Sequence, residues 1–278
     1  MRMTAYGVYN VDKFRTEIMC DTESEAQQYY DNSDYKEVLE VKEFTVFKLD
    51  PLYIEILKSF RHINNAIIFG DQETAVVSVD HSITGQCKLF KMPQEFALDS
   101  LAKFLSMFNF VNTSTIYLSD KNIYMQSEED DKDEKTYETI FSSGLGIAEV
   151  RPNFELDDKF PPLDISFELS KKNIADMKKA SNILSIDTVA FSFKGNELII
   201  DVSDKDAKTP SDLCKIKIEI DNPQNLKFEL LFRSGEFNLL NTDYSCQANT
   251  VLAVFRAKPI NEIDVGLAYY VSSGVEKD

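Results

Sequence analysis

Four lysine side chains lie on one short segment of a chain whose overall charge is strongly negative. The chain carries 47 Asp and Glu residues against 30 Lys and Arg residues, a formal net charge of −17. Ammonium groups gathered on one surface attract phosphate or carboxylate groups. An ordinary solvated helix face is the alternative interpretation, and the lysine residues alone do not decide between the two. These residues are Lys171, Lys172, Lys178 and Lys179.

The spacing around these lysine residues predicts an amphipathic helix. Ser170 precedes the segment and is a favoured N-cap residue. At roughly 100° per residue, one side of the helix is apolar and the lysine residues spread over the other. Asp176 lies on the flank, so no acidic residue falls inside the basic arc. The apolar side consists of Ile174, Met177, Ala180 and Leu184.

Residue types that perform catalysis or bind metals do not form a recognisable site. His62 and His81 are the two histidine residues, and neither has a cysteine or an acidic residue at metal-ligand spacing. Phosphate-binding and nucleophile motifs of the types G-x-x-x-x-G-K-[ST], G-x-G-x-x-G and G-x-S-x-G are absent from the sequence. The acidic run 128–134 lacks the glycine and the spacing of an EF-hand and is interpreted as a solvated loop. We therefore expect no enzymatic activity, no cofactor and no metal.

Composition narrows the class of protein. With 278 residues, 43% apolar and 12% aromatic, the chain is long enough for two domains with substantial cores. No apolar stretch approaches the roughly 20 residues that cross a bilayer, and the N-terminus has no apolar signal core. The four cysteine residues are widely spaced, which is typical of reduced thiols in a cytosolic compartment. A pI near 4.6 argues against a protein that wraps DNA in a basic surface.

An internal repeat organises the chain. Residues 47–69 resemble residues 167–191 at an offset of 120, with Ile54 matching Ile174 and Lys58 matching Lys178. Each copy reads as a short strand, a helix and an apolar strand. A weaker pair, 96–108 and 228–240, suggests a second repeating unit, and further strands follow each unit. The predicted fold class is α+β, with four β-α-β-β-β units in two similar domains.

The predicted domains are 44–150 and 164–278, joined by a connector at 151–163 that contains three proline residues. Residues 1–43 stand outside the repeat. They read as a strand, a capped helix and a strand, a small βαβ-like extension whose role the sequence does not indicate.

The order of these units over residues 46–271 resembles the two-domain DNA sliding clamps, and most closely the processivity clamps of large tailed bacteriophages. The similarity is carried by K-L-D-P-L-Y-I-E-I-L-K-S-F-R-H-I-N, which looks like the first helix of that family and the short strand before it. F-A-L-D-S-L-A-K-F-L-S-M-F-N-F-V-N looks like its second helix. S-N-I-L-S-I-D-T-V-A-F-S-F-K-G-N-E-L-I-I looks like its third helix and the following strands. The N-terminal extension departs from the family pattern.

The resemblance implies a homotrimeric ring that encircles duplex DNA without sequence preference and tethers a DNA polymerase. Helices line the hole of such a ring, and strands form its outer layer. The other implied partner is an ATPase that loads the clamp, and the implied location is the cytoplasm of an infected bacterial host. A structural or scaffolding protein, a virion or ring-forming component that does not bind DNA, remains the alternative interpretation.

The resemblance also gives the basic helix a role, because lysine residues that face the hole would meet the phosphates. An ammonium group about 10 Å from a phosphate across water gains roughly 0.4 kcal/mol before screening, which is less than RT. Such weak contacts centre the duplex while leaving it free to slide. Glu55 stands where Ala175 stands in the repeat, so the first helix is less basic than the third. The DNA-facing residues implied are Lys171, Lys172, Lys178 and Lys179, and secondarily Lys58, Arg61 and His62 on the first helix, Lys103 on the second and Arg233 at the fourth.

Closure of the ring requires edge strands, and the resemblance implies that 136–142 pairs with 213–220 of a neighbouring chain. Alternatively, each segment belongs inside its own sheet. The implied interface residues are Tyr137, Thr139, Phe141, Leu213, Ile216, Ile218 and Ile220.

Partners of such clamps dock a short peptide into an apolar pocket near the connector. The apolar side chains of the connector are Phe154, Leu156 and Phe160. The alternative is that they hold the connector against the protein's own core.

Overall fold

The structure is a computed structural model of the chain, and it divides into two compact units. One unit contains Met1–Ile54 and Ala102–Leu145, and the other contains Glu55–Leu101 and Gly146–Asp278. Helix α2 (Pro51–Phe60) and helix α3 (Leu101–Val111) each pass from one unit to the other. The structure describes residues 3–10, 15–20, 22–33, 39–70, 73–80, 82–88, 95–111, 115–119, 122–126, 138–142, 162–186, 188–203, 213–222, 224–233 and 238–273.

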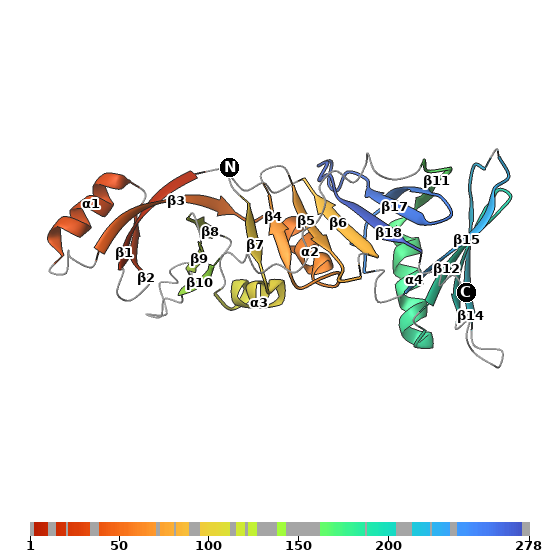
Figure 1. The fold of residues 1–278 in the computed structure, drawn as a ribbon, viewed down its shortest axis with the longest axis horizontal. Coiled ribbons are helices and arrows are strands. Elements are labelled where there is room, and N and C mark those ends of the chain that lie inside the picture. Colours follow the sequence, from red (N-terminus) through yellow and green to blue (C-terminus); the bar gives the residue numbers. More distant parts are fainter. Residues whose placement is uncertain are drawn as a thin grey trace. The chain divides into compact units, whose positions relative to one another are not determined.

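The first unit is built on a six-stranded sheet with the order β10-β9-β8-β3-β1-β2, in which all neighbours are antiparallel (Figure 1). β3 crosses residue 43, so the predicted N-terminal extension shares one sheet with the residues that follow it. The strands are β1 (Met3–Asn10), β2 (Arg15–Cys20), β3 (Leu39–Lys48), β8 (Thr115–Leu118), β9 (Asn122–Gln126) and β10 (Glu138–Ser142).

The N-terminal extension contains one strand more than the sequence predicted. β1 lies between β2 and β3 and is antiparallel to both, so β2, helix α1 (Glu23–Asn32) and β3 form a split β-α-β unit around it. Thr22 and Glu25 form a capping box at the start of α1, in which each side chain accepts from the other's backbone N–H. The predicted capped helix is therefore present.

Aromatic rings form much of the core of the first unit. The rings of Phe44 on β3 and Tyr124 on β9 meet edge to face at 5.1 Å. Phe104 on α3 packs against Phe141 on β10, with ring centroids 5.5 Å apart. Such pairs contribute about 0.5–1.5 kcal/mol beyond the apolar area they bury. Helix α3 is thereby held against the last strand of the sheet.

The second unit contains an eight-stranded sheet that joins strands from both halves of the sequence. Its order is β11-β16-β17-β18-β6-β5-β4-β7, and the pairing of β18 with β6 connects residues about 185 positions apart. The strands are β4 (Ile67–Phe69), β5 (Thr74–Val77), β6 (Ile83–Cys87), β7 (Phe96–Leu98), β11 (Ile165–Leu169), β16 (Tyr244–Ala248), β17 (Leu252–Ala257) and β18 (Ala268–Ser272).

Different elements pack on the two faces of the eight-stranded sheet. On one face, Tyr269 packs edge to face on Phe60 of α2, and the hydroxyl groups of Tyr269 and Ser59 lie 2.6 Å apart. On the other face, Leu163 of the connector's end packs on a buried cluster that includes Tyr270. The alternation of side chains along β18 thus holds α2 on one side and the connector's end on the other.

A four-stranded antiparallel sheet, order β14-β13-β12-β15, completes the second unit. Phe191 of this sheet contacts Phe167 and Phe255 of the eight-stranded sheet, with ring centroids 6.3 and 6.2 Å apart. Helix α4 (Lys171–Leu184) lies alongside it (Figure 1). The strands are β12 (Thr188–Lys194), β13 (Glu197–Ser203), β14 (Leu213–Glu219) and β15 (Lys227–Arg233).

The second repeating unit predicted from the sequence has the predicted strand and helix in its first copy and differs in its second copy. In 96–108, the first three residues form β7 and the helix begins at Leu101. In 228–240, residues up to Arg233 form β15, and no helix occurs among the described residues of the segment. Burial that alternates from one residue to the next is typical of a strand, since Leu230 and Phe232 are buried while Glu229 and Arg233 are exposed.

In the part of the chain that the structure describes, no helix is long and apolar enough to span a membrane.

Candidate nucleic-acid interface

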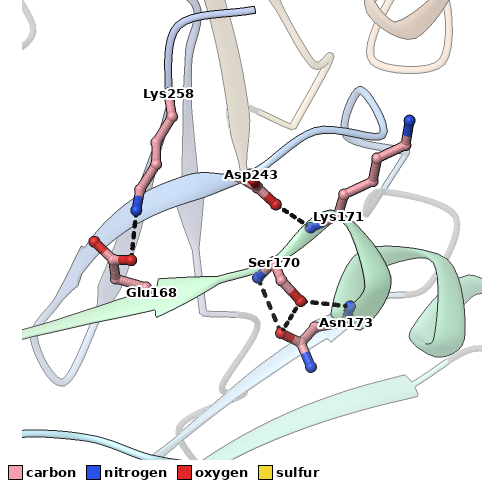
Figure 2. A network of polar contacts seen from close by, with 6 residues as sticks. All are labelled: Glu168, Ser170, Lys171, Asn173, Asp243 and Lys258. Carbon is pink, nitrogen blue, oxygen red and sulfur yellow. Dashed lines mark hydrogen bonds and ion pairs between the residues drawn. The ribbon is translucent and has the colours of Figure 1, made fainter.

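The start of helix α4 is fixed by a network of polar contacts (Figure 2). Ser170 and Asn173 form a capping box, as expected for the predicted N-cap. The backbone N–H of Lys171 donates to the Asp243 carboxylate at 2.6 Å, so a residue distant in sequence also caps the helix. The ion pair of Lys258 with Glu168 lies beside it. These contacts fix the position at which the lysine residues emerge.

Three of the four lysine residues on α4 are exposed, namely Lys171, Lys172 and Lys179. Figure 2 shows the Lys171 side chain extending away from the polar network at the helix start. The opposite side of the helix is buried, with Ile174 and Met177 at 0% and 1% exposure. The predicted amphipathic helix is therefore present.

Lys178 differs from the other lysine residues. Its side chain is half-buried, and its ammonium group donates to the backbone carbonyl of Leu239 at 2.6 Å. Burial lowers the pKa of Lys178. Lys178 directly follows Met177 and lies four residues after Ile174, which places it at the border of the apolar side. The sequence predicted Lys178 among the exposed lysine residues, whereas the structure gives it a partner within the protein.

The segment that Lys178 contacts is held by several further hydrogen bonds. The backbone N–H of Leu240 donates to the Tyr269 hydroxyl at 3.2 Å, and the Tyr244 hydroxyl donates to the Leu240 carbonyl at 2.5 Å. Tyr269 also bonds Ser59 of α2. Burial raises the pKa values of Tyr244 and Tyr269 above the ordinary range of tyrosine, so both hydroxyl groups remain protonated donors. Helices α2 and α4 are thus tied to the same short segment.

The C-terminal end of α2 brings further cationic groups near α4. The pKa of His62 is lowered, first by burial and then by the positive charges of Arg61 and Lys178. His62 and Arg61 are both exposed. Lys58 pairs with Glu55 at 2.7 Å, so its charge is partly neutralised within the helix. Of the residues predicted on the first helix, His62 lies close enough to Lys178 to be affected by its charge, and Arg61 is its neighbour in sequence.

The two remaining predicted DNA-facing residues lie elsewhere. Lys103 is exposed on the part of α3 that belongs to the first unit. Arg233 is exposed at the end of β15, where its backbone pairs with Thr188. Arg233 therefore lies on a strand, whereas the sequence predicted that it would lie at a fourth helix.

Both segments predicted to close a ring are edge strands. β10 is the last strand of the six-stranded sheet, and β14 is the last strand of the four-stranded sheet. Along β14, Ile216 and Ile218 are half-buried while Lys215, Lys217 and Glu219 are exposed, which confirms the predicted one-sided strand. Leu213 is 49% exposed, and Ile220 is buried just after the strand. Phe141 contacts Phe104, Thr139 pairs with Met125, and Tyr137 lies outside the described residues.

The connector residues Phe154, Leu156 and Phe160 also lie outside the described residues. The described end of the connector is anchored on the second unit. The Asn249 side chain donates to the Pro162 carbonyl at 3.2 Å, and the Asp164 N–H donates to the Ala248 carbonyl at 2.8 Å.

Two exposed apolar residues that the sequence analysis did not single out lie close to the end of β18. Val251 is 51% exposed, and its carbonyl accepts a hydrogen bond from the N–H of Ser273. Val79 is 71% exposed in the turn whose Ser82 carbonyl accepts from the N–H of Ser272. The sequence signal that could have identified them is a valine residue within a short polar turn, S-V-D-H-S for Val79 and N-T-V-L for Val251.

Among the described residues, no group of three or more His, Cys, Asp or Glu side chains could hold a metal ion.

The pKa of His62 provides a test of the arrangement around Lys178. We expect the pKa of His62 to lie below the ordinary histidine value of about 6.5. Lys178→Met should raise this pKa part of the way back, because burial and Arg61 remain. Since the folded state binds this proton more weakly than the unfolded chain, His62 contributes stability above pH 6.5 that is lost as the pH falls.

The measurement is an NMR titration of the imidazole signals, with His81→Gln to assign them. Lys179→Met is the matched control and should leave the pKa of His62 unchanged, because Lys179 is exposed and is not among the charges that shift it. An unshifted pKa of His62, or equal effects of the two variants, would contradict the described proximity of His62 to Lys178.

The chain is similar to known sliding clamps in sequence and in fold. It is 25% identical over 204 residues to the sliding clamp of Vibrio phage KVP40, covering 71% of this chain and 88% of that protein. No family model matches the sequence.

Three solved structures share the fold at low sequence identity. The PCNA2–PCNA3 complex of Sulfolobus tokodaii gives a TM-score of 0.58 at 10% identity, covering 82% of this chain and 99% of that one. The proliferating cellular nuclear antigen of Entamoeba histolytica gives a TM-score of 0.58 at 12% identity, and the match covers 83% of this chain and 98% of that one. The Helicobacter pylori beta clamp in complex with 5-chloroisatin gives a TM-score of 0.55 at 13% identity, and the match covers 85% of this chain and 74% of that one. The resemblance stated from the sequence is confirmed: the chain has the fold of the DNA sliding clamps and is similar in sequence to a bacteriophage sliding clamp.

Proposed function

We propose that this protein is a sliding clamp that encircles duplex DNA as a homotrimeric ring and tethers the replicative DNA polymerase. The clamp fold and the similarity to a phage sliding clamp support this function. A clamp works by topology and not by chemistry, which agrees with the lack of a catalytic motif in the sequence. Opening a closed ring requires energy, so an ATPase that loads the clamp is the expected partner. The expected location is the cytoplasm of an infected bacterial host.

The observation that carries the proposal is the pair of edge strands, β10 and β14. They belong to different sheets and different units, as a head-to-tail ring requires. Pairing β10 of one chain with β14 of the next would continue both sheets across the junction. It would also remove two edges that otherwise invite aggregation.

Helix α4 supplies the surface for DNA in this proposal. Lys171, Lys172 and Lys179 are exposed on it, while the chain as a whole carries a charge of −17. Positive charge exposed on α4 favours phosphate at this helix, while the net negative charge of the chain disfavours it in general. Contacts to phosphate through water are weak, and they lose strength as salt rises. Retention on DNA would therefore come from closure of the ring.

Charge reversal on α4 tests the proposed DNA surface. With Lys171→Glu and Lys179→Glu combined, we expect the length of DNA synthesised per binding event to fall to less than about a tenth at moderate salt, because attraction becomes repulsion. The measurement is polymerase processivity on a primed circular template, with the loader present.

Lys194→Glu combined with Lys227→Glu makes the same charge change at exposed positions of the four-stranded sheet. This control should retain processivity. If the α4 variant stays fully processive, or if both pairs lose it equally, the assignment of α4 to DNA is wrong.

The polymerase would dock near the connector, at the surface around the end of β18 where Val79 and Val251 are exposed. This surface flanks the end of β18, and the neighbouring Leu252 belongs to the cluster on which Leu163 of the connector packs. Exposed apolar side chains beside polar backbone suit the anchor residues of a short peptide. The connector residues Phe154, Leu156 and Phe160 remain part of this proposal.

Val251→Asp tests the docking surface. A carboxylate at this position should weaken polymerase binding by about tenfold or more, because an apolar anchor would have to desolvate it. Ile263→Asp is the matched control, since Ile263 is 49% exposed in another turn of the same unit. Binding is measured by surface plasmon resonance on the folded clamp. Equal affinities for the two variants would place the polymerase elsewhere.

A further inference from the structure

Helices α3 and α4 each carry one large apolar residue that is exposed in the last turn. Ile183 of α4 is 69% exposed, and Phe110 of α3 is 60% exposed. Every other large apolar residue of these two helices is buried or half-buried. On α4, Ile183 follows Lys172, Asp176 and Lys179 along the same exposed stripe at helical spacing. A solvated stripe has no need of a large apolar residue at its end, so these two positions require an explanation.

Ile183 lies in the last turn of α4, which ends near the end of the four-stranded sheet at which β14 begins. The chain leaves α4 after Leu184 and enters β12 at Thr188. Across the sheet, Val189 pairs with Val202, and Val202 pairs with Cys214 next to Leu213. The end of α4 and the first residues of β14 are therefore at the same end of the sheet. Leu213 is 49% exposed there, so apolar surface continues from the helix to the edge strand.

Phe110 is at the end of the helix that packs on the other edge strand. Phe104 of α3 packs against Phe141 of β10, which holds this helix against the end of the six-stranded sheet. Phe110 follows Phe104 by fewer than two turns, on the exposed side with Lys103 and Ser106. Each of the two edge strands is thus backed by a helix that ends in an exposed apolar side chain.

We propose that Ile183 of one chain packs against Phe110 of a second copy, as a helix-to-helix contact beside the β10–β14 pairing. This inference rests on the proposed ring. α3 packs on the buried face of the six-stranded sheet, and α4 packs on the buried face of the four-stranded sheet. If β10 and β14 pair so that these two buried faces are continuous, α3 of one chain and α4 of the next lie on the same side of the joined sheet. Helices packed against neighbouring strands approach to about 8–10 Å between axes, which brings their side chains into contact.

The occupant is a second copy because the two patches complement each other. Each is small, apolar and adjacent to a strand edge that presents backbone donors and acceptors, and the matching edge is on the same kind of chain. The contact would have a defined role. Strand pairing sets the register of the junction, while the apolar contact excludes water on the helix side and lowers the rate at which the junction opens.

The test is the concentration at which the assembled protein half-dissociates, measured by analytical ultracentrifugation of the full chain. Ile183→Ser and Phe110→Ser should each raise this concentration by about tenfold. The double variant should raise it by less than the product of the two, because both substitutions remove the same contact. Ile263→Ser removes an exposed apolar side chain from a turn away from both edges and should leave dissociation unchanged. Circular dichroism checks that each variant folds.

A second measurement tests direct contact. With Cys20 and Cys214 replaced by serine, the Phe110→Cys, Ile183→Cys chain should form covalent oligomers with a short bifunctional maleimide, and either single cysteine variant should not. Wild-type dissociation in both serine variants, or the lack of such crosslinks in an assembled ring, would overturn the contact and leave the proposed clamp intact. A wild-type chain that never assembles would overturn both.

Discussion

The two strand edges at β10 and β14 are the constraint on which this account of the protein depends. An edge strand presents a row of backbone N–H and C=O groups that are satisfied by water or by another strand. In the described part of the chain, β10 pairs only with β9, and β14 only with β13. A chain with one such edge in each of two units has the means to join copies of itself head to tail. In the proposed clamp, closure of the ring, retention on DNA and the need for a loader would all follow from that arrangement.

In the proposed clamp, the charges on the protein surface position the DNA, and they are not the main source of affinity for it. The chain carries a surplus of carboxylates, and in the proposed clamp the exposed lysine residues of α4 are the ones that face the phosphates. Lys178 shows that a lysine residue in a basic run can serve the fold. Its ammonium group binds the Leu239 carbonyl and links α4 to a segment that Tyr269 and Ser59 connect to α2. In the proposed clamp, three exposed lysine residues per chain would then be left for the phosphates, which suits a contact that must allow sliding.

The sequence predicted the amphipathic helices and one-sided strands well, because both depend on local periodicity. The cap at Ser170, the buried side of α4 and the alternation along β14 were all visible in the residue pattern. The sequence did not predict the hydrogen bond of Lys178, which depends on where a distant segment lies in space. Arg233 was misplaced because a weak repeat was given more weight than the period-two pattern Leu230, Phe232. The pairing of β18 with β6 joins distant segments and had no local signal.

The measurement that tests the central claim most directly is the native mass of the wild-type protein, by light scattering behind a sizing column over a range of concentrations. The account predicts about 95 kDa, three times the 31.8 kDa of one chain, with dissociation only on dilution. A protein that stays at 31.8 kDa at high concentration would contradict the pairing of β10 with β14, and with it the ring and the topological hold on DNA.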